Sequence, residues 1–124
     1  MKSDKLIITD FSIKKQVFNG ITPKNNDTLV RALIRKIKSK NWSQIEINNI
    51  VYYKMYVMGK KYRAVITIVK NYVHLLVLYR HKNDGKSTKN ISKYDNESAE
   101  VIKSNTIKVS NDYKNGNFII FDIS

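Results

Sequence analysis

The spacing of hydrophobic positions changes along the chain and divides it into predicted elements. Leu6, Ile7 and Ile8 predict a first strand, and residues 20–26 predict a loop. The segment between them, which ends at Gly20, has apolar residues at 11, 13, 17 and 18 and is of undecided type. Asp27 suits a helix N-terminus, and the run TLVRALIRKIKSK after it repeats apolar residues with helical spacing. The repeat predicts an amphipathic helix whose outer face carries Arg31, Arg35 and Lys38.

Beyond Trp42 the sequence favours strands. β-Branched and aromatic residues predict three of them, over 45–58, 62–69 and 72–79, joined by tight turns at 59–61 and 70–71. Consecutive strands with such short connections predict an antiparallel meander.

Three local features complete the predicted order. Asn48-Asn49 indicates either a bulge or a further turn inside the first of these strands. Residues 92–103 predict a helix, and residues 106–110 with 118–123 suggest a terminal hairpin around 114–116.

The predicted class is α+β: an N-terminal strand and helix, or helices, packed on an antiparallel meander of three to four strands, with a C-terminal helix and, as an option, a terminal hairpin. The chain has no repeat and no Gly- or Pro-rich linker, which predicts a single basic domain over residues 1–124, with 94–124 as its acidic last element or an extension.

If helices cover one face of the sheet, the other face is open, and strict alternation gives candidates for it. Tyr52, Lys54 and Tyr56 share one face of their strand, a pattern that suits RNA because lysine meets phosphates and tyrosine stacks on bases. An ordinary strand with half-buried tyrosines explains it equally well. In the last strand, alternation groups Val77 and Tyr79 with Val73 and Leu75.

The chain is strongly basic, and its charge is unevenly distributed. The chain carries 23 Lys+Arg against 10 Asp+Glu, a formal charge of +13, which favours an anionic partner. Residues 1–93 hold 20 basic and 5 acidic groups, whereas residues 94–124 hold 3 and 5. Lys, Asn and Ile supply 50 of the 124 residues, so codon bias inflates the lysine count. The placement of particular basic groups is therefore better evidence than their number.

Composition also limits the chemistry. The chain has no cysteine, no phosphate-binding glycine motif and no metal-ligand motif, so we expect neither a cofactor nor a metal. The longest apolar run before Asp10 has only three residues, so we expect a cytoplasmic protein that does not contact membranes.

Residues that bind phosphate and move protons gather at the end of the last predicted strand. Tyr79-Arg80-His81-Lys82 combines a phenol, a guanidinium, an imidazole and an ammonium, although a plain basic strand end accounts for it as well. His74, inside an apolar strand, is expected to be packed with its ring satisfied. Without a metal, the chemistry that remains is cleavage of RNA by its own 2′-OH. Arg31 and Arg35 are either phosphate contacts or merely solvated.

The middle of the chain resembles a known family. Residues 56–66, which contain a Gly-Lys turn and Tyr62-Arg63, the strand 73–79 with its Leu-Leu pair, and the Lys-containing segment 80–84 together resemble the RelE/ParE toxin superfamily, especially its HigB-like members. The resemblance covers about residues 27–103. It implies a metal-independent endoribonuclease that cleaves mRNA, typically on the ribosome, and is neutralised by an acidic antitoxin-like partner.

The resemblance also implies roles for residues. Arg63, at the family's Tyr-Arg position, would hold the scissile phosphate. Charge stabilisation and proton transfer would fall to Arg80, His81 and Lys82. The candidates for positioning and stacking the RNA are Lys54, Tyr56 and Tyr79.

Two features depart from the family, and two other functions stay open. Residues 104–124 extend past the family's usual end, and the tail over residues 94–124 carries a net charge of −2. ParE-like members of the family act on gyrase rather than RNA. The alternatives are a non-catalytic nucleic-acid-binding protein and an interaction protein from a phage or mobile element, whose lysines reflect codon bias.

Overall fold

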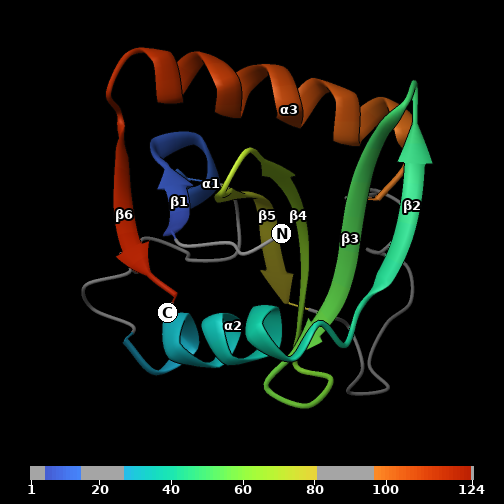
Figure 1. The fold of residues 1–124 in the computed structure, drawn as a ribbon, viewed down its shortest axis with the longest axis vertical. Coiled ribbons are helices and arrows are strands. Elements are labelled where there is room, and N and C mark those ends of the chain that lie inside the picture. Colours follow the sequence, from blue (N-terminus) through green and yellow to red (C-terminus); the bar gives the residue numbers. More distant parts are fainter. Residues whose placement is uncertain (1–4, 15–26, 81–96, 124) are drawn as a thin grey trace.

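A six-stranded mixed sheet with three helices confirms the predicted α+β class (Figure 1). The computed structural model describes residues 5–14, 27–80 and 97–123. The elements follow the chain in this order: β1 (Lys5–Thr9), α1 (Asp10–Lys14), α2 (Asp27–Ser39), β2 (Ser43–Ile47), β3 (Ile50–Val57), β4 (Tyr62–Val69), β5 (Tyr72–Arg80), α3 (Ala99–Lys114) and β6 (Phe118–Asp122).

The strands lie side by side in the order β2-β3-β4-β5-β1-β6, with β2 and β6 at the two edges (Figure 1). Strands β2 to β5 form the predicted meander, with four strands. The first strand extends it, because β1 pairs parallel to β5 through Lys5↔Tyr72 and Ile7↔His74. On its other side β1 pairs antiparallel to β6.

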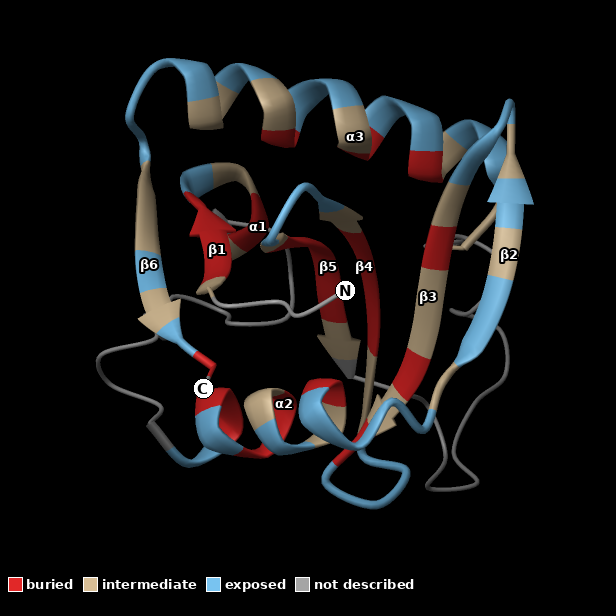
Figure 2. Ribbon diagram, in the orientation of Figure 1, coloured by how far each residue is buried: buried red, intermediate tan, exposed pale blue. Residues whose placement is uncertain are grey.

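Helices cover both faces of the sheet, so the prediction of one open face was wrong. On one face, α2 buries Leu29, Leu33 and Ile37 against strand residues that include Met55 and Ile66. On the other, α1 and α3 cover a second core (Figure 2), whose buried residues are Tyr52, Val65, Leu76, Val77, Ile102 and Val109. The buried Tyr52, which shares a hydrogen bond of 3.2 Å with Thr106, does not belong to an RNA-binding surface.

The predicted terminal hairpin was also wrong, because residues 106–110 lie inside α3. The side chain of Ser98 caps this helix by accepting a hydrogen bond from the amide of Val101. Gly116, with φ of +77°, turns the chain out of the helix into β6. The strand over 118–122 was predicted correctly, but its partner is β1.

Asn48-Asn49 is a turn between β2 and β3. Both residues have positive φ, 51° and 67°, which matches the two central positions of a type I′ hairpin. Of the two alternatives left open by the sequence, the turn is therefore the one that occurs.

A bulge in β5 changes which of its side chains share a face. The register with β4 shifts so that Val65 pairs with Val77, whereas Ile66 pairs with Leu75. Leu76 is the extra residue, and it lies with Val77 in the core under α3. The alternation predicted for this strand fails at that point, and Tyr79 consequently shares the α3 face with Arg63.

Candidate functional site

Three predicted site residues form a row across the α3 face of the sheet. Tyr56 of β3 pairs with Arg63 of β4, and Arg63 pairs with Tyr79 of β5. Directly paired residues project from the same face. Lys54 lies two positions before Tyr56 in β3 and therefore on that face as well.

Glu97 meets this row from the chain segment that leads into α3. Its carboxylate accepts hydrogen bonds from Arg63, at 2.7 Å from Nε to Oε2 and 3.4 Å from Nη2 to Oε1. The hydroxyl of Tyr79 donates to the same Oε2, and Nζ of Lys54 lies 3.4 Å from Oε1. We call Lys54, Tyr56, Arg63, Tyr79 and Glu97 the Glu97 cluster.

The aromatic ring of Tyr56 packs against the guanidinium of Arg63. The Arg63 Cζ atom lies 4.5 Å from the ring centroid, and Nζ of Lys60 lies 5.9 Å from it. Both distances are within the range of a cation–π contact. The neutral ring thus holds the cations of Lys60 and Arg63 close together.

Burial and charge act in opposite directions on the cluster. Burial favours the neutral form of Glu97, but the hydrogen bonds from Arg63 and Tyr79 and the charges of Arg63 and Lys54 outweigh it, so the pKa of Glu97 lies below its ordinary value. Burial likewise disfavours the charged form of Arg63, and the bond and charge of Glu97 raise the pKa of Arg63 in spite of it. At neutral pH the cluster holds an ionised carboxylate and two cations.

The charged side chains of the Glu97 cluster are partly buried but remain accessible to solvent. The side chains of Arg63, Glu97 and Lys54 keep 15%, 21% and 22% of their surface exposed. Arg63 uses Nε and Nη2 on Glu97, and its Nη1 makes no hydrogen bond with another residue of the described ranges. The arrangement can therefore offer an N–H donor to an anion beside a carboxylate that can accept a proton.

A basic pocket lies on the other side of Tyr56. It has a volume of about 710 Å³ between the C-terminal half of α2 and the β3–β4 turn. Its cationic side chains are Arg35, Lys36 and Lys61, and Tyr56 lines it too. Tyr56 is thus common to this pocket, which we call the α2 pocket, and to the Glu97 cluster.

The other predicted site residues have different outcomes. Arg31 and Arg35 are exposed on α2, as the helical spacing predicted. Arg80 ends β5, opposite Tyr62, while His81 and Lys82 lie outside the described residues. The convergence of Arg80 and His81 with Arg63 therefore stays a prediction.

Sequence reasoning missed Glu97. The only available signal was the position of this carboxylate, one residue before the capping serine of α3, in a segment that also carries Asp95 and Glu100. Its partners lie 18 to 43 positions earlier in the chain, so local patterns could not assign them.

No protein-family model matches the chain, and no curated protein or solved structure gives a significant match. The resemblance to the RelE/ParE superfamily thus stays a prediction. Within the described ranges there is no group of three or more His, Cys, Asp or Glu residues that could hold a metal ion, and no helix long and apolar enough to span a membrane.

Proposed function

We propose that this protein binds single-stranded RNA and cleaves it without a metal ion at the Glu97 cluster. The observation that carries the proposal is the direct contact of Glu97 with Arg63, on a surface where Lys54 and Tyr79 reach the same carboxylate. It joins a proton acceptor to phosphate-binding cations, which is the minimum that RNA self-cleavage requires.

In the proposed reaction the 2′-OH of the RNA transfers its proton to the carboxylate of Glu97. The 2′ oxygen forms a bond to the adjacent phosphorus, and the bond from phosphorus to the 5′ oxygen breaks. Arg63, through Nη1, and Lys54 stabilise the charge on the non-bridging oxygens. The products are a 2′,3′-cyclic phosphate and a 5′-hydroxyl end.

The departing 5′ oxygen takes up one proton. His81 is the predicted donor, and this role comes from the sequence alone. The first step, in which the 2′-OH loses its proton, requires an ionised base. Because its pKa is lowered, Glu97 is ionised throughout the neutral range and can accept that proton.

The test is incubation of the pure protein with single-stranded RNA in EDTA, with DNA of the same sequence as the control that lacks a 2′-OH. We expect cyclic phosphate ends from RNA only. Arg63→Ala and Glu97→Gln should each slow cleavage by about 100-fold or more. Lys114→Ala, which removes one cation at the far end of α3, should leave the rate unchanged. Absence of cleavage, or equal rates for all variants, would contradict the proposal.

The second candidate function is RNA binding without cleavage, and the α2 pocket favours it. Three cations around a pocket suit a phosphate backbone whether or not chemistry follows. Intact RNA that stays bound at low salt and dissociates as salt rises would support this candidate over the nuclease.

We further propose that a small acidic protein restrains the activity. The net charge of +13 and the cations on α2 favour a partner of opposite charge. Co-expression with the product of a neighbouring gene tests this: a stable complex that blocks RNA cleavage supports it, and the lack of any acidic neighbour counts against it.

A further inference from the structure

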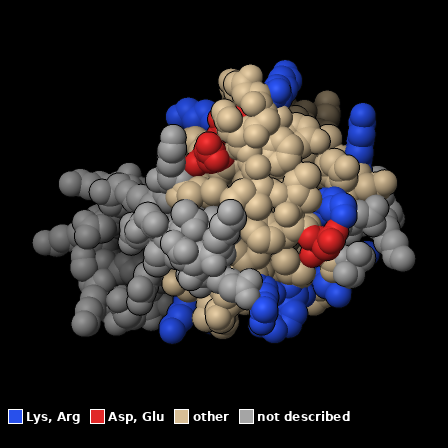
Figure 3. Space-filling view, turned by 90° about the vertical axis from the view of Figure 1, so that its left-hand side faces the viewer, with Lys and Arg blue, Asp and Glu red and all other residues tan. Residues whose placement is uncertain are grey.

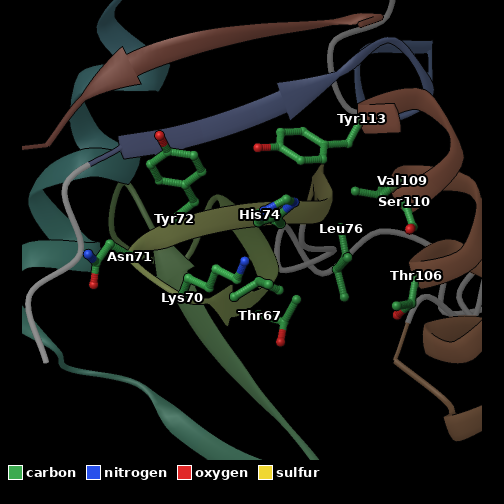
Figure 4. A pocket seen from close by; sticks show the side chains of 11 residues that line it. Thr67, Lys70, Asn71, Tyr72, His74, Leu76, Thr106, Val109, Ser110 and Tyr113 are labelled. Carbon is green, nitrogen blue, oxygen red and sulfur yellow. The ribbon is translucent and has the colours of Figure 1, made fainter. Parts of the chain in front are cut away.

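A second pocket lies on the α3 face, away from the Glu97 cluster. It has a volume of about 520 Å³ and opens between the β4–β5 hairpin and the C-terminal half of α3. His74 lies at its centre, and we call it the His74 pocket (Figure 4). His74 pairs with Thr67, four residues along β4 from Arg63, or about 13 Å at the rise of a strand. The two sites are therefore separate but share one face of the sheet.

The walls of the His74 pocket are suited to a flat ring. Leu76 and Val109 supply apolar surface, and the rings of Tyr72 and Tyr113 flank His74 (Figure 4). The Tyr113 ring meets the His74 ring edge-on, with centroids 4.9 Å apart, and is itself supported by Phe118. These contacts hold the aromatic groups in place before a ligand binds.

Several polar groups in the pocket have no partner in the described structure. The His74 side chain is buried, with the residue only 7% exposed, yet its ring nitrogens make no hydrogen bond with a described residue. The prediction that His74 is packed is confirmed, and the prediction that its ring is satisfied stays a prediction. Ser110 is likewise without such a bond, whereas Thr67 and Thr106 donate to the carbonyls of Val51 and Ile102.

Burial lowers the pKa of His74, so the imidazole is neutral at pH 7 and presents one donor and one acceptor. A ligand edge with matching donors and acceptors could therefore form hydrogen bonds with these groups. The ligand should therefore combine flat apolar faces with hydrogen-bonding atoms on its rim.

A cation stands at the mouth of the pocket. Lys70 occupies the β4–β5 turn with φ of +58°, and Figure 4 shows its side chain running along the pocket toward His74. The tight turn sets the direction in which the side chain of Lys70 leaves the backbone, and its ammonium can reach an anionic group of a ligand in the pocket.

From this combination we infer that the His74 pocket binds a nucleobase whose attached phosphate contacts Lys70. The base would lie between the tyrosine rings with its edge toward His74 and Ser110. Its source is either a free nucleoside monophosphate or one nucleotide of a single strand. The inference does not rest on cleavage at the Glu97 cluster, because binding is measured without turnover.

The test is titration of the protein with each of the four nucleoside 5′-monophosphates, observed through the imidazole proton resonances. The chain has two histidines, so the His74→Phe variant identifies the signals of His74. We expect at least one nucleotide to shift these signals and to saturate. The matching nucleoside should bind more weakly, and ribose 5-phosphate and benzoate should not shift them.

Three variants test the contacts. His74→Phe keeps a ring of similar size, and Tyr113→Leu removes a wall; each should weaken binding about 5-fold to 100-fold. Lys70→Asn suits the positive φ and should abolish the advantage of the nucleotide over the nucleoside. Lys103→Gln, at an exposed lysine of α3 that does not line the pocket, removes the same charge and should have no effect. Thermal unfolding shows whether each variant is folded.

A short RNA distinguishes the two sources of the base. Shifts of the His74 signals by the RNA at lower concentration than by the mononucleotide indicate a strand, and shifts by the mononucleotide alone indicate a free ligand. The inference is overturned if no nucleotide shifts these signals, if benzoate shifts them equally, or if folded His74→Phe and Tyr113→Leu bind as well as the original chain.

Discussion

Glu97 is a partly buried carboxylate whose charge is shared between the fold and the candidate site. A carboxylate moved out of water loses hydration, and it is stable there only when cations and donors replace that hydration. Arg63, Lys54 and Tyr79 make these replacements, and they come from three different strands. The same contacts that join α3 to the sheet thus prepare a base beside a phosphate-binding guanidinium.

This coupling predicts a pH dependence of stability. Because the pKa of Glu97 is lower in the folded chain, its ionised form stabilises the fold above its unfolded pKa, about pH 4. That contribution disappears as the pH falls through the lower, folded value. Glu97→Gln should therefore reduce the free energy of unfolding by about 1–2 kcal/mol at pH 7, and the difference between the two proteins should shrink as the pH falls below about 4.

Urea denaturation of both proteins between pH 3 and 7 measures this difference. Glu100→Gln, at an exposed carboxylate in the first turn of α3, serves as the control and should change stability by less than about 0.5 kcal/mol. A difference between the Glu97 variant and the original chain that is constant over the whole pH range would show that ionisation of Glu97 does not stabilise the fold.

The sequence predicted the positions of residues whose face is set by strand alternation, and it missed those whose position depends on tertiary pairing. Tyr56 and Arg63 lie where alternation in β3 and β4 places them. Tyr79 reached the same face only through the bulge at Leu76, which shifts the register without a glycine or proline to signal it. Glu97 contacts strands much earlier in the chain, and nothing in its local sequence specifies that pairing.

At the scale of elements, α3 decides where Glu97 lies. Its first turn is fixed by Ser98, whose side chain accepts the amide proton of Val101, and Glu97 is the residue before this cap. We expect Ser98→Ala to lower the free energy of unfolding by about 1 kcal/mol. It should also slow RNA cleavage less than Glu97→Gln does, because the carboxylate is kept but held less firmly.

Denaturation and cleavage assays on Ser98→Ala and Ser98→Thr check this effect. Threonine keeps the hydroxyl that caps the helix and should retain most of the stability. Equal losses for the two variants would mean that the cap hydrogen bond is not what holds this end of α3.

The elements that could be predicted are those with local signals. The helix over 27–39 has a strong apolar period and an aspartate at its start, and the hairpins have tight turns. The C-terminal region lacks such signals: residues 106–110 are compatible with a strand, but packing of Ile102 and Val109 on the sheet makes them helical. The pairing of β6 with β1 joins opposite ends of the chain, so no local pattern could reveal it.

For the whole molecule, the location of the basic side chains matters more for RNA binding than their number. Figure 3 shows the side on which β6 lies, with a largely uncharged centre and with Lys and Arg around its margins, both below, at the level of α2, and above, at the level of α3. The Glu97 cluster and the α2 pocket meet at Tyr56. A strand of RNA that enters the cluster would therefore have a cationic surface beside it.

If RNA follows this surface, its affinity should depend on which cations are removed. Each phosphate contact on a single strand contributes about 0.7 to the slope of log K against log salt concentration. Replacing Arg35, Lys36 and Lys61 with alanine should make the slope shallower by about 2. Replacing three exposed lysines of α3, at positions 103, 108 and 114, changes the net charge equally but should alter the slope little. Fluorescence anisotropy with a labelled RNA over a salt series measures these slopes. Equal changes in slope for both triple variants would mean that RNA binding depends on the total charge of the chain rather than on the α2 pocket.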